Sequence, residues 1–355
     1  MNITGNLERQ ADLATVAPIR PLVSKPVSFL TLRRRVLILG VGPLAGELSQ
    51  VLMSKRRSFT QVIGFLDNDA EHVGEGPANP SIIGSYGQLS EVVRRYQINT
   101  IVVCLEDRRA ILPVEILLDM KVAGTQVVDG HNLFEKESGR LSIDHIKPSA
   151  LIFSTGFQRR MGTMIAKRLM DVALSAIGLV ILSPLFAFLA ALIKLDSPGP
   201  VFYKQTRVGL GSRPYEIWKF RSMCQDAEKN GARWACENDP RVSRVGRWMR
   251  KWRLDELPQL INVWKCEMSI VGPRPERPVF VDELRKSVPY YDVRHTIRPG
   301  ITGWAQVSFR YGASAEDSHM KLQYDLYYVK KLTLWLDLRI MGATVIVMLF
   351  GNGAR

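Results

Sequence analysis

The sequence Val36-Leu37-Ile38-Leu39-Gly40-Val41-Gly42-Pro43-Leu44-Ala45 begins with four apolar residues and continues through two glycines. The apolar residues are typical of a short buried strand, and the glycines permit a tight turn into a helix. Further strand-like runs follow at residues 61–66, 100–105 and 125–128, and helix-like segments separate them. Because strands that alternate with helices form parallel sheets, we expect an α/β, Rossmann-like domain over residues 35–135.

The same stretch contains a GxGxxA motif, and Asp67 follows the second predicted strand. In nucleotide-binding folds such glycines let a phosphate approach a helix N-terminus, and an acidic residue at this distance binds a ribose. Pro43, however, lacks a backbone amide that a phosphate would use. Two interpretations stay open: a nucleotide site at Gly40, Gly42 and Asp67, or a turn kept for packing alone.

A second feature is the apolar run over residues 172–193, which contains no charged residue. At about 1.5 Å per residue, a helix of this length reaches roughly 33 Å and could cross a hydrocarbon core of about 30 Å. Ser183 and Pro184 lie in its middle, and proline breaks a helix because it lacks an N–H donor. The run therefore predicts either a kinked spanning helix or a re-entrant helix that returns to the same membrane face.

The remainder of the chain has the pattern of a mixed α+β domain. Strand-like segments at residues 201–207 and 215–221, on either side of a glycine-containing turn, predict a β-hairpin. Residues 332–350 combine apolar side chains with Asp337 and Arg339. This mixture favours an amphipathic helix in the membrane interface over a spanning helix.

Charge is distributed unevenly over the 355 residues, which carry a formal net charge of +14. Residues 1–150 contain 17 Lys/Arg and 16 Asp/Glu, whereas residues 151–355 contain 31 and 18. The cationic surface therefore belongs to the second half, where anionic lipid, polyprenyl phosphate, nucleotide diphosphates and nucleic acid are candidate partners. With 46% hydrophobic residues, the chain is neither wholly disordered nor a polytopic membrane protein.

Cysteine and histidine positions exclude two further classes of site. The four cysteines and five histidines show no CxxC, HxxxH or HExxH spacing, so we expect reduced thiols and no structural zinc. The first 34 residues have no apolar core of signal-peptide length, so we expect no secretion signal.

The residues most suited to chemistry are the adjacent carboxylates Asp255 and Glu256, which follow a run of arginines over residues 241–253. Pro258 is tolerated in the first turn of a helix, so the pair lies at or just before a helix N-terminus. Capping would explain the acidic pair but not the converging cations. An ionised aspartate among guanidinium groups, together with Mg²⁺, suits attack on phosphorus. Nucleic acid is not an expected partner, because no nucleic-acid-binding signature is present.

Six motifs follow one another in the second half of the chain: KRLMD (167–171), Ser183-Pro184, GPVFYKQTRVG (199–209), KFRSM (219–223), LDELPQLINVWKCEMSIVGPRPE (254–276) and RPGITGWAQV (298–307). With them, residues 164–355 closely resemble the catalytic domain of bacterial sugar transferases, the monotopic polyprenyl-phosphate phosphoglycosyltransferases. The resemblance implies transfer of a sugar-1-phosphate from a UDP-sugar, with UDP-glucose or UDP-galactose favoured, to undecaprenyl phosphate. UMP is released, and the product begins exopolysaccharide or O-antigen repeat-unit assembly.

The resemblance also implies roles for individual residues. Asp255 would be the nucleophile that forms a phosphosugar–enzyme intermediate, with Glu256 as its partner, and the pair would hold Mg²⁺. Ser183 and Pro184 would break a re-entrant membrane helix. Four arginines would bind substrate phosphates: Arg250, Arg274, Arg221 and Arg298.

The expected organisation is a polar lead-in (1–34), the Rossmann-like domain (35–135), a linker (136–163), the re-entrant helix (164–196) and the catalytic domain with its interfacial C-terminal helix (197–355). The resemblance places the enzyme on the bacterial inner membrane, with the catalytic domain on the cytoplasmic face. Expected partners are undecaprenyl phosphate, a UDP-sugar, inner-membrane lipids, downstream glycosyltransferases and a second copy in a homodimer. Larger family members begin with about four transmembrane helices that this sequence lacks, so the role of the N-terminal domain stays open.

Two other functions compete with this one. The chain could be a catalytically inactive, nucleotide-sensing assembly scaffold, although the intact Asp–Glu pair argues against it. A nucleotide-sugar oxidoreductase or epimerase is disfavoured, because residues 100–150 contain no tyrosine for the usual Tyr-x-x-x-Lys pair.

Overall fold

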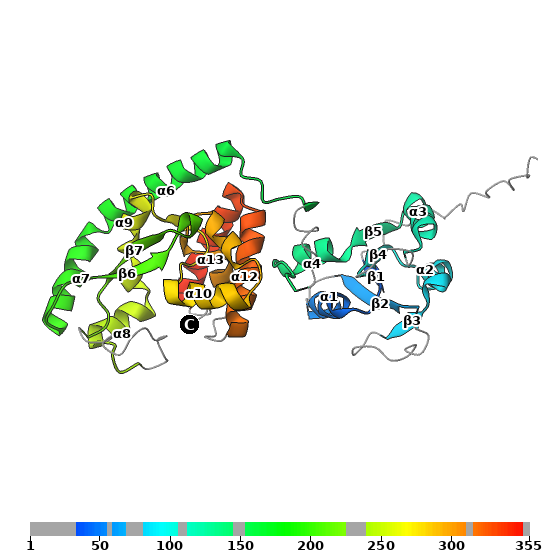
Figure 1. The fold of residues 1–355 in the computed structure, drawn as a ribbon, viewed down its shortest axis with the longest axis horizontal. Helices are drawn as coiled ribbons and strands as arrows, with labels where there is room; N and C mark the ends of the chain where they lie inside the picture. The colour runs from blue at the N-terminus through cyan, green and yellow to red at the C-terminus, as the bar shows by residue number, and fades with distance from the viewer. Residues whose placement is uncertain are drawn as a thin grey trace, which may run out of the picture. The chain divides into compact units, whose positions relative to one another are not determined.

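The computed structural model describes residues 33–54, 59–68, 81–105, 112–144, 153–224, 239–309 and 315–350. The chain divides into two compact units, residues 1–45 with 52–128 and residues 46–51 with 129–355, whose elements are labelled in Figure 1. Most of the predicted lead-in, and residues 145–152 of the predicted linker, lie outside the described residues.

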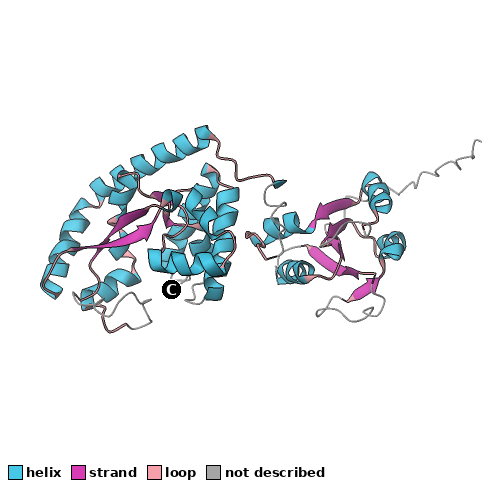
Figure 2. Ribbon diagram, viewed as in Figure 1, coloured by secondary structure: helices cyan, strands magenta, loops and turns pink. Residues whose placement is uncertain are grey.

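The first unit is built on a five-stranded sheet with the strand order β3-β2-β1-β4-β5 (Figure 2). The pairs β1–β2, β1–β4 and β2–β3 are parallel, so the predicted parallel α/β sheet is confirmed. Its elements are β1 (Arg34–Leu39), α1 (Pro43–Ser54), β2 (Thr60–Leu66), β3 (Ile82–Gly84), η2 (Tyr86–Gln88), α2 (Leu89–Arg95), β4 (Thr100–Val103), α3 (Val114–Val122) and β5 (Gln126–Asp129). Residues 46–51 within α1 and the last residue of β5 belong to the second unit.

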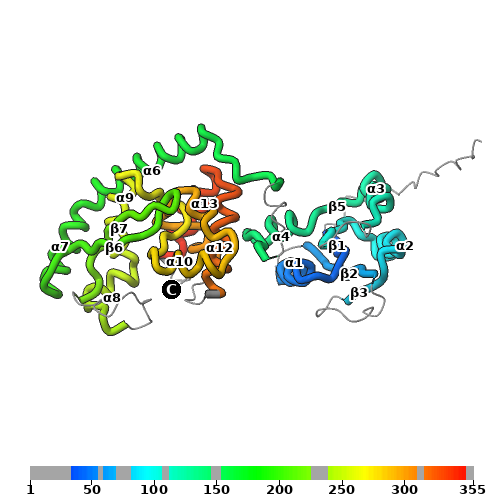
Figure 3. The backbone as a smooth tube through the Cα atoms, viewed as in Figure 1, coloured from blue at the N-terminus to red at the C-terminus, as the bar shows by residue number. Residues whose placement is uncertain are grey.

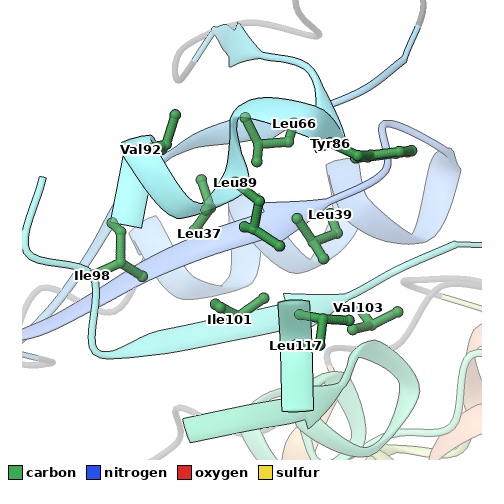
Figure 4. Packing of buried hydrophobic residues seen from close by; sticks show 10 residues of the cluster. All are labelled: Leu37, Leu39, Leu66, Tyr86, Leu89, Val92, Ile98, Ile101, Val103 and Leu117. Carbon is green, nitrogen blue, oxygen red and sulfur yellow. The ribbon is translucent and has the colours of Figure 1, made fainter. Parts of the chain in front are cut away.

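One buried apolar cluster holds this sheet to its helices (Figure 4). Leu37 and Leu39 are alternate residues of β1, so they point to the same face, where they join Ile101 and Val103 of β4. From the helical side, α2 contributes Leu89 to the same cluster. Each side chain of this size stabilises the fold by about 1.5–3 kcal/mol when buried.

The second unit is mainly helical and contains two small sheets among its described residues. Its backbone can be followed in Figure 3. Its elements are α4 (Gly130–Ser138), α6 (Met161–Ile181), α7 (Ser183–Asp196), β6 (Phe202–Val208), η3 (Leu210–Ser212), β7 (Pro214–Phe220), α8 (Arg244–Lys251), η4 (Leu254–Glu256), α9 (Gln259–Trp264), β8 (Ser269–Val271), α10 (Pro278–Ser287), η5 (Tyr291–Thr296), β9 (Gly300–Thr302), α11 (Trp304–Ser308), α12 (Ala315–Lys330) and α13 (Leu334–Phe350).

Strands β6 and β7 form the predicted β-hairpin. They pair antiparallel, with Phe202 opposite Phe220, and the rings of these two residues stack with centroids 5.3 Å apart. Both rings pack in a core with Leu189 and Ile193 of α7 and with Met249 of α8. This core fixes the end of β7 against α8, which is where the arginine run of the sequence lies.

The segment after β5 is part of the second unit. Leu141 and Ile143 are buried in one core with Leu322 and Leu326 of α12, and the backbone N–H of Leu141 donates to the carbonyl of Gln323. The predicted linker (136–163) therefore begins inside α4 and contributes two side chains to a core. The sequence gives no hint of this, because the residues that cover them lie about 180 positions later.

Helices α6 and α7 are bent by 60° relative to each other, with the break at Leu182. Ser183 and Pro184 open α7, as predicted, and the Ser183 hydroxyl donates to the carbonyl of Val180 at 2.8 Å. Within the described part of the chain, no helix taken alone has the length and apolar composition to cross a membrane, whereas the bent pair together does. The bent apolar helix pair is confirmed, and its membrane insertion stays a prediction.

Helix α13 has one face in the core and another exposed. Leu336 and Ile340 pack against Val271 and Tyr328, whereas Trp335 and Ile346 are 76% and 59% exposed. Asp337, which in the sequence favoured an interfacial over a spanning helix, is fully buried and pairs with Lys167 of α6 at 2.8 Å. The Asp337 carboxylate therefore links α13 to α6. The location of the exposed face in a membrane interface stays a prediction.

Candidate active site

The two carboxylates are presented by a sharp turn between α8 and α9. Arg253 has a positive φ of 54°, which turns the chain out of α8, and η4 follows directly. Pro258 occupies the N-cap position of α9, so Asp255 and Glu256 lie just before this helix, as the proline predicts. Both residues are only 8% exposed.

Glu256 is held by cations from two other segments. The Nη2 atom of Arg274 lies 2.7 Å from Oε1, and Nζ of Lys219 lies 3.3 Å from the same oxygen. Burial alone would raise the pKa of Glu256, but Arg274 and Lys219 outweigh it and hold the pKa well below its usual range. Glu256 is therefore a permanently ionised, immobile carboxylate at neutral pH.

Asp255 differs from its neighbour because its carboxylate makes no side-chain hydrogen bond or ion pair with the described residues. Burial, and next the charge of Glu256, raise its pKa above the usual 3.8, while Lys219, Arg250 and Arg274 act in the opposite direction. A buried carboxylate without hydrogen-bond donors has both oxygens available for an incoming electrophile or cation.

Two of the four predicted phosphate-binding arginines lie at this site. Arg274 contacts Glu256 from the loop after β8, where Pro273 and Pro275 flank it. Arg250 of α8 lowers the pKa of Asp255, and its Nε donates to the Ser222 hydroxyl at 2.9 Å.

The other two arginines make their described contacts elsewhere. Arg221 is 6% exposed and donates to the carbonyls of Ser197 and Pro198, at 2.7 and 2.8 Å, just after α7. Arg298 is half-buried and donates from Nε to the carbonyl of Cys266 at 2.9 Å. These hydrogen bonds hold backbone segments together, and a phosphate-binding role for either residue stays a prediction.

Lys219 is the member of the site that sequence reasoning missed. It lies on β7, and burial lowers its pKa, although the charge of Glu256 opposes that effect. The available signal was a lysine between Trp218 and Phe220 in a strand, because an interior cation in such a setting needs a carboxylate partner. Nothing local identifies that partner, which is 37 positions away.

The donor set suits a magnesium ion that is shared with a substrate. Among the described residues, no group of three or more His, Cys, Asp or Glu side chains is placed to bind a metal. Glu256 is engaged by Arg274 and Lys219, so Asp255 is the carboxylate with free oxygens. Mg²⁺ is commonly bound through one or two carboxylates together with substrate phosphates and water, which fits this arrangement.

The glycine motif of the first unit has a structural explanation of its own. Gly40 has a φ of +96°, and a Cβ at this position would lie 3.1 Å from Leu105 and 3.3 Å from the carbonyl of Cys104. Asp67 follows β2 and accepts a hydrogen bond from the Tyr86 hydroxyl at 3.4 Å. The turn is thus required for chain reversal and close packing, and nucleotide binding at Gly40, Gly42 and Asp67 stays a prediction.

Comparisons with known proteins add three relatives. The chain is 45% identical over 228 residues (62% of this chain, 52% of the relative) to the UDP-N-acetylgalactosamine-undecaprenyl-phosphate N-acetylgalactosaminephosphotransferase of Aeromonas hydrophila. It is 31% identical over 345 residues (94% and 62%) to the undecaprenyl-phosphate glucose phosphotransferase of Komagataeibacter xylinus. It is 41% identical over 181 residues (50% and 39%) to the UDP-glucose:undecaprenyl-phosphate glucose-1-phosphate transferase of Escherichia coli strain K12.

The chain spans between 39% and 62% of the length of these relatives. The sequence model of the family described as "Bacterial sugar transferase" matches residues 162–351, which is more than half of the chain. The matched region contains the bent helix pair except Met161, and it contains Asp255, Glu256 and the cations Lys219, Arg250 and Arg274. The chain therefore belongs to the bacterial sugar transferase family.

Proposed function

We propose that this protein transfers a sugar-1-phosphate from a UDP-sugar to undecaprenyl phosphate, releases UMP, and so begins the assembly of an exopolysaccharide or O-antigen repeat unit. The observation that carries the proposal is the contrast between two adjacent buried carboxylates. Glu256 is immobilised by Arg274 and Lys219, whereas Asp255 has no described partner. The names of the three relatives, all undecaprenyl-phosphate sugar transferases, support it.

In the first step, a carboxylate oxygen of Asp255 attacks the phosphorus that carries the sugar. A new oxygen–phosphorus bond forms, the bond from that phosphorus to the bridging oxygen breaks, and UMP leaves with the electron pair. Nearby cations stabilise charge that develops on the phosphoryl oxygens, and the electrostatic effect of Arg250 on Asp255 supports this role for Arg250.

In the second step, a phosphate oxygen of the lipid attacks the same phosphorus. The bond between phosphorus and Asp255 breaks, the carboxylate is regenerated, and undecaprenyl-diphosphate sugar is the product. Covalent catalysis of this kind divides one difficult displacement into two easier ones. Glu256, fixed and ionised, keeps the cationic side chains in position through both steps.

We propose Asp255 as the residue that holds Mg²⁺ together with the substrate diphosphate, with Glu256 adjacent to it. When bound, the ion neutralises diphosphate charge. The protein's own contribution is to keep an oxygen of Asp255 free and to surround it with Lys219, Arg250 and Arg274.

The donor sugar is proposed to be a UDP-hexose. The relative that matches 94% of this chain is named for glucose, and the relative that is 45% identical is named for N-acetylgalactosamine. Assays should therefore compare UDP-glucose, UDP-galactose and UDP-N-acetylgalactosamine.

We propose that α6 and α7 enter the cytoplasmic face of the inner membrane as a re-entrant pair. Two features support this: the 60° bend and exposed apolar side chains on both helices, such as Val180, which is 74% exposed, and Phe188, which is 55% exposed. A lipid surface would cover these side chains and bring the lipid acceptor to the same unit that contains Asp255.

The test is the identity of the nucleotide product. The purified chain, in detergent or lipid discs with Mg²⁺ and undecaprenyl phosphate, is incubated with each UDP-sugar, and UMP and UDP are separated by chromatography. UMP that depends on the lipid acceptor supports the proposal, and the sugar that releases it names the donor. UDP as the product would overturn the phosphosugar mechanism. If neither nucleotide is released, the inactive scaffold is favoured.

The matched variants are Asp255→Asn and Asp282→Asn. Asp282 lies on α10 of the same unit, and its side chain is 67% exposed. We expect Asp255→Asn to abolish UMP release in a protein that still folds, and Asp282→Asn to behave like the unmodified enzyme. Incubation with UDP-sugar in the absence of lipid should add the mass of a phosphosugar to the peptide that contains Asp255. Full activity of Asp255→Asn would exclude it as the nucleophile.

A further inference from the structure

The loop Pro273-Arg274-Pro275 has few backbone hydrogen-bond donors. Proline has no backbone N–H, so two of its three residues cannot donate hydrogen bonds that would fix the loop. The position of Arg274, and with it the clamp on Glu256, must therefore depend on donors that reach the loop's carbonyl oxygens.

Each of the three carbonyls accepts a hydrogen bond from a different segment. The carbonyl of Pro273 accepts from the backbone N–H of Gly300 at 3.0 Å. The carbonyl of Arg274 accepts from Nη2 of Arg294 at 2.7 Å. The carbonyl of Pro275 accepts from Nη1 of Arg207 at 3.1 Å.

Two of these donors are arginines that are themselves held by carboxylates. Arg294, on η5, is 6% exposed and pairs with Asp325 of α12 at 2.8 Å. Its Nη1 also donates to the hydroxyl of Tyr291 at 2.6 Å. Arg207, on β6, lies 3.6 Å from Glu276. Each guanidinium is thereby oriented before it reaches the loop.

A buried ion pair such as that of Arg294 and Asp325 is a poor source of stability. Desolvation of the two charges offsets most of their attraction, and apolar replacements are often neutral or stabilising. Its main consequence here is geometric. A small cavity of about 10 Å³ is lined by Arg274, Arg294 and Asp325 among others, whereas Pro273 and Pro275 are buried. Packing of the two prolines and hydrogen bonds to the three carbonyls together set where the loop lies.

We propose that Arg294, backed by Asp325, and Arg207, backed by Glu276, are positioning residues that clamp the Pro273–Pro275 loop and thereby aim Arg274 at Glu256. Their hydrogen bonds act on the reaction through the position of Arg274. This inference rests on the proposed function for its kinetic readout, and it also predicts an effect that needs no turnover.

The kinetic test is a double-mutant cycle on UMP release. Arg294→Lys keeps the charge but loses the planar fork that holds two partners. We expect kcat to fall roughly 10- to 100-fold, as for a catalytic group displaced by about 1 Å, with little change in KM. In an Arg274→Lys background the same substitution should change kcat by less than about twofold. The contact of Arg274 with Glu256, through which Arg294 acts, is already lost in that background.

The turnover-independent test is hydrogen exchange at the backbone amide of Gly300, which donates to the carbonyl of Pro273. Because the hydrogen bonds from Arg294 and Arg207 hold the same loop, their loss should raise the exchange rate of this amide in both Arg294→Lys and Arg207→Lys. This readout needs no turnover. If the unmodified enzyme releases no UMP, only the proposed function is refuted.

The matched control is Arg285→Lys. Arg285 also pairs with a carboxylate, Asp292, at 2.8 Å, but its side chain is 42% exposed and it lies on α10. It should leave kcat and the exchange rate of the Gly300 amide unchanged. Arg207→Lys carries the test if Arg294→Lys does not fold. The proposal is overturned if the folded variants keep the original exchange rate of the Gly300 amide, or if losses in kcat multiply fully in the Arg274→Lys background.

Discussion

Arg274 and Glu256 are joined by an ion pair of 2.7 Å between the loop after β8 and the last residue of η4. The pair lies beside Asp255, whose pKa is raised by burial and by Glu256 and lowered by Arg274. Together, the two residues therefore influence the electrostatic potential at the candidate nucleophile and its pKa. A change at either one should alter chemistry without touching the reacting atom.

Arg274→Lys should reduce kcat for UMP release. Lysine keeps the positive charge but cannot hold both oxygens of Glu256 in the planar arrangement of a guanidinium. Loss of one charge-assisted hydrogen bond costs about 1.5–3 kcal/mol, which corresponds to roughly 10- to 100-fold in rate. The check is steady-state kinetics together with thermal unfolding. An unchanged kcat in a folded variant would show that the ion pair is not required for turnover.

The pH dependence of kcat should report the ionisation of Asp255. The nucleophile must be ionised, and its pKa is raised above the usual 3.8, so activity should fall as pH decreases through that raised value. Glu256→Gln removes a negative charge and should move this acid limb to lower pH. Lys219→Met removes a positive charge and should move it to higher pH.

The measurement is a complete pH–rate profile of each of these two variants, compared with that of the unmodified enzyme. Lys204→Met is the matched control, because Lys204 lies on the paired strand β6 and its side chain is 47% exposed. Its profile should superimpose on that of the unmodified enzyme. Shifts of Glu256→Gln and Lys219→Met in the same direction would contradict the electrostatic account.

Local signals in the sequence predicted much of the architecture. Strand-and-helix alternation indicated the parallel sheet, and Pro184 indicated the break between α6 and α7. Pro258 placed Asp255 and Glu256 just before a helix. The two inferences from proline depend on residues within one or two turns of one another, where backbone sterics and hydrogen bonding leave few alternatives. Each strand or helix of the sheet likewise follows from the periodicity of its own short segment.

Features that depend on distant contacts were not accessible in this way. Asp337 in α13 favoured an interfacial over a spanning helix, and no local signal shows that it is buried against Lys167, which is 170 positions away. Lys219 reaches Glu256 across 37 positions, and Leu141 is covered by residues of α12. The local sequence pattern around a charged or apolar residue is the same whether or not a distant part of the chain packs against it. One sequence therefore does not distinguish a buried residue from an exposed one in these positions.

The buried pair of Lys167 and Asp337 gives a prediction about stability. Lys167 also donates to the carbonyl of Val271, and the Tyr328 hydroxyl donates to Asp337 at 2.6 Å. Lys167→Met would leave the Asp337 carboxylate buried without its cation, which should lower the free energy of unfolding by about 3–5 kcal/mol. Denaturant unfolding in detergent measures this.

Two further variants test the cause of that loss. The double substitution Lys167→Met with Asp337→Leu should recover much of the stability, since an apolar pair needs no compensation. Lys204→Met breaks an exposed pair with Glu216 and should cost at most about 1 kcal/mol. A double variant as unstable as Lys167→Met would indicate that lost packing, not the unpaired charge, is responsible.

Gly246 allows α8 to pack closely against the chain that leaves β7. A Cβ at this position would overlap the carbonyl of Ser222, whose hydroxyl accepts from Arg250, so Gly246→Ala should push α8 away and displace Arg250 from Asp255. We expect loss of both stability and UMP release. Gly342→Ala is the matched control, because a Cβ there meets nothing within 4 Å, and in a helix it should stabilise by up to about 1 kcal/mol. If thermal unfolding and kcat of Gly246→Ala matched those of Gly342→Ala, this close approach would not be what places Arg250.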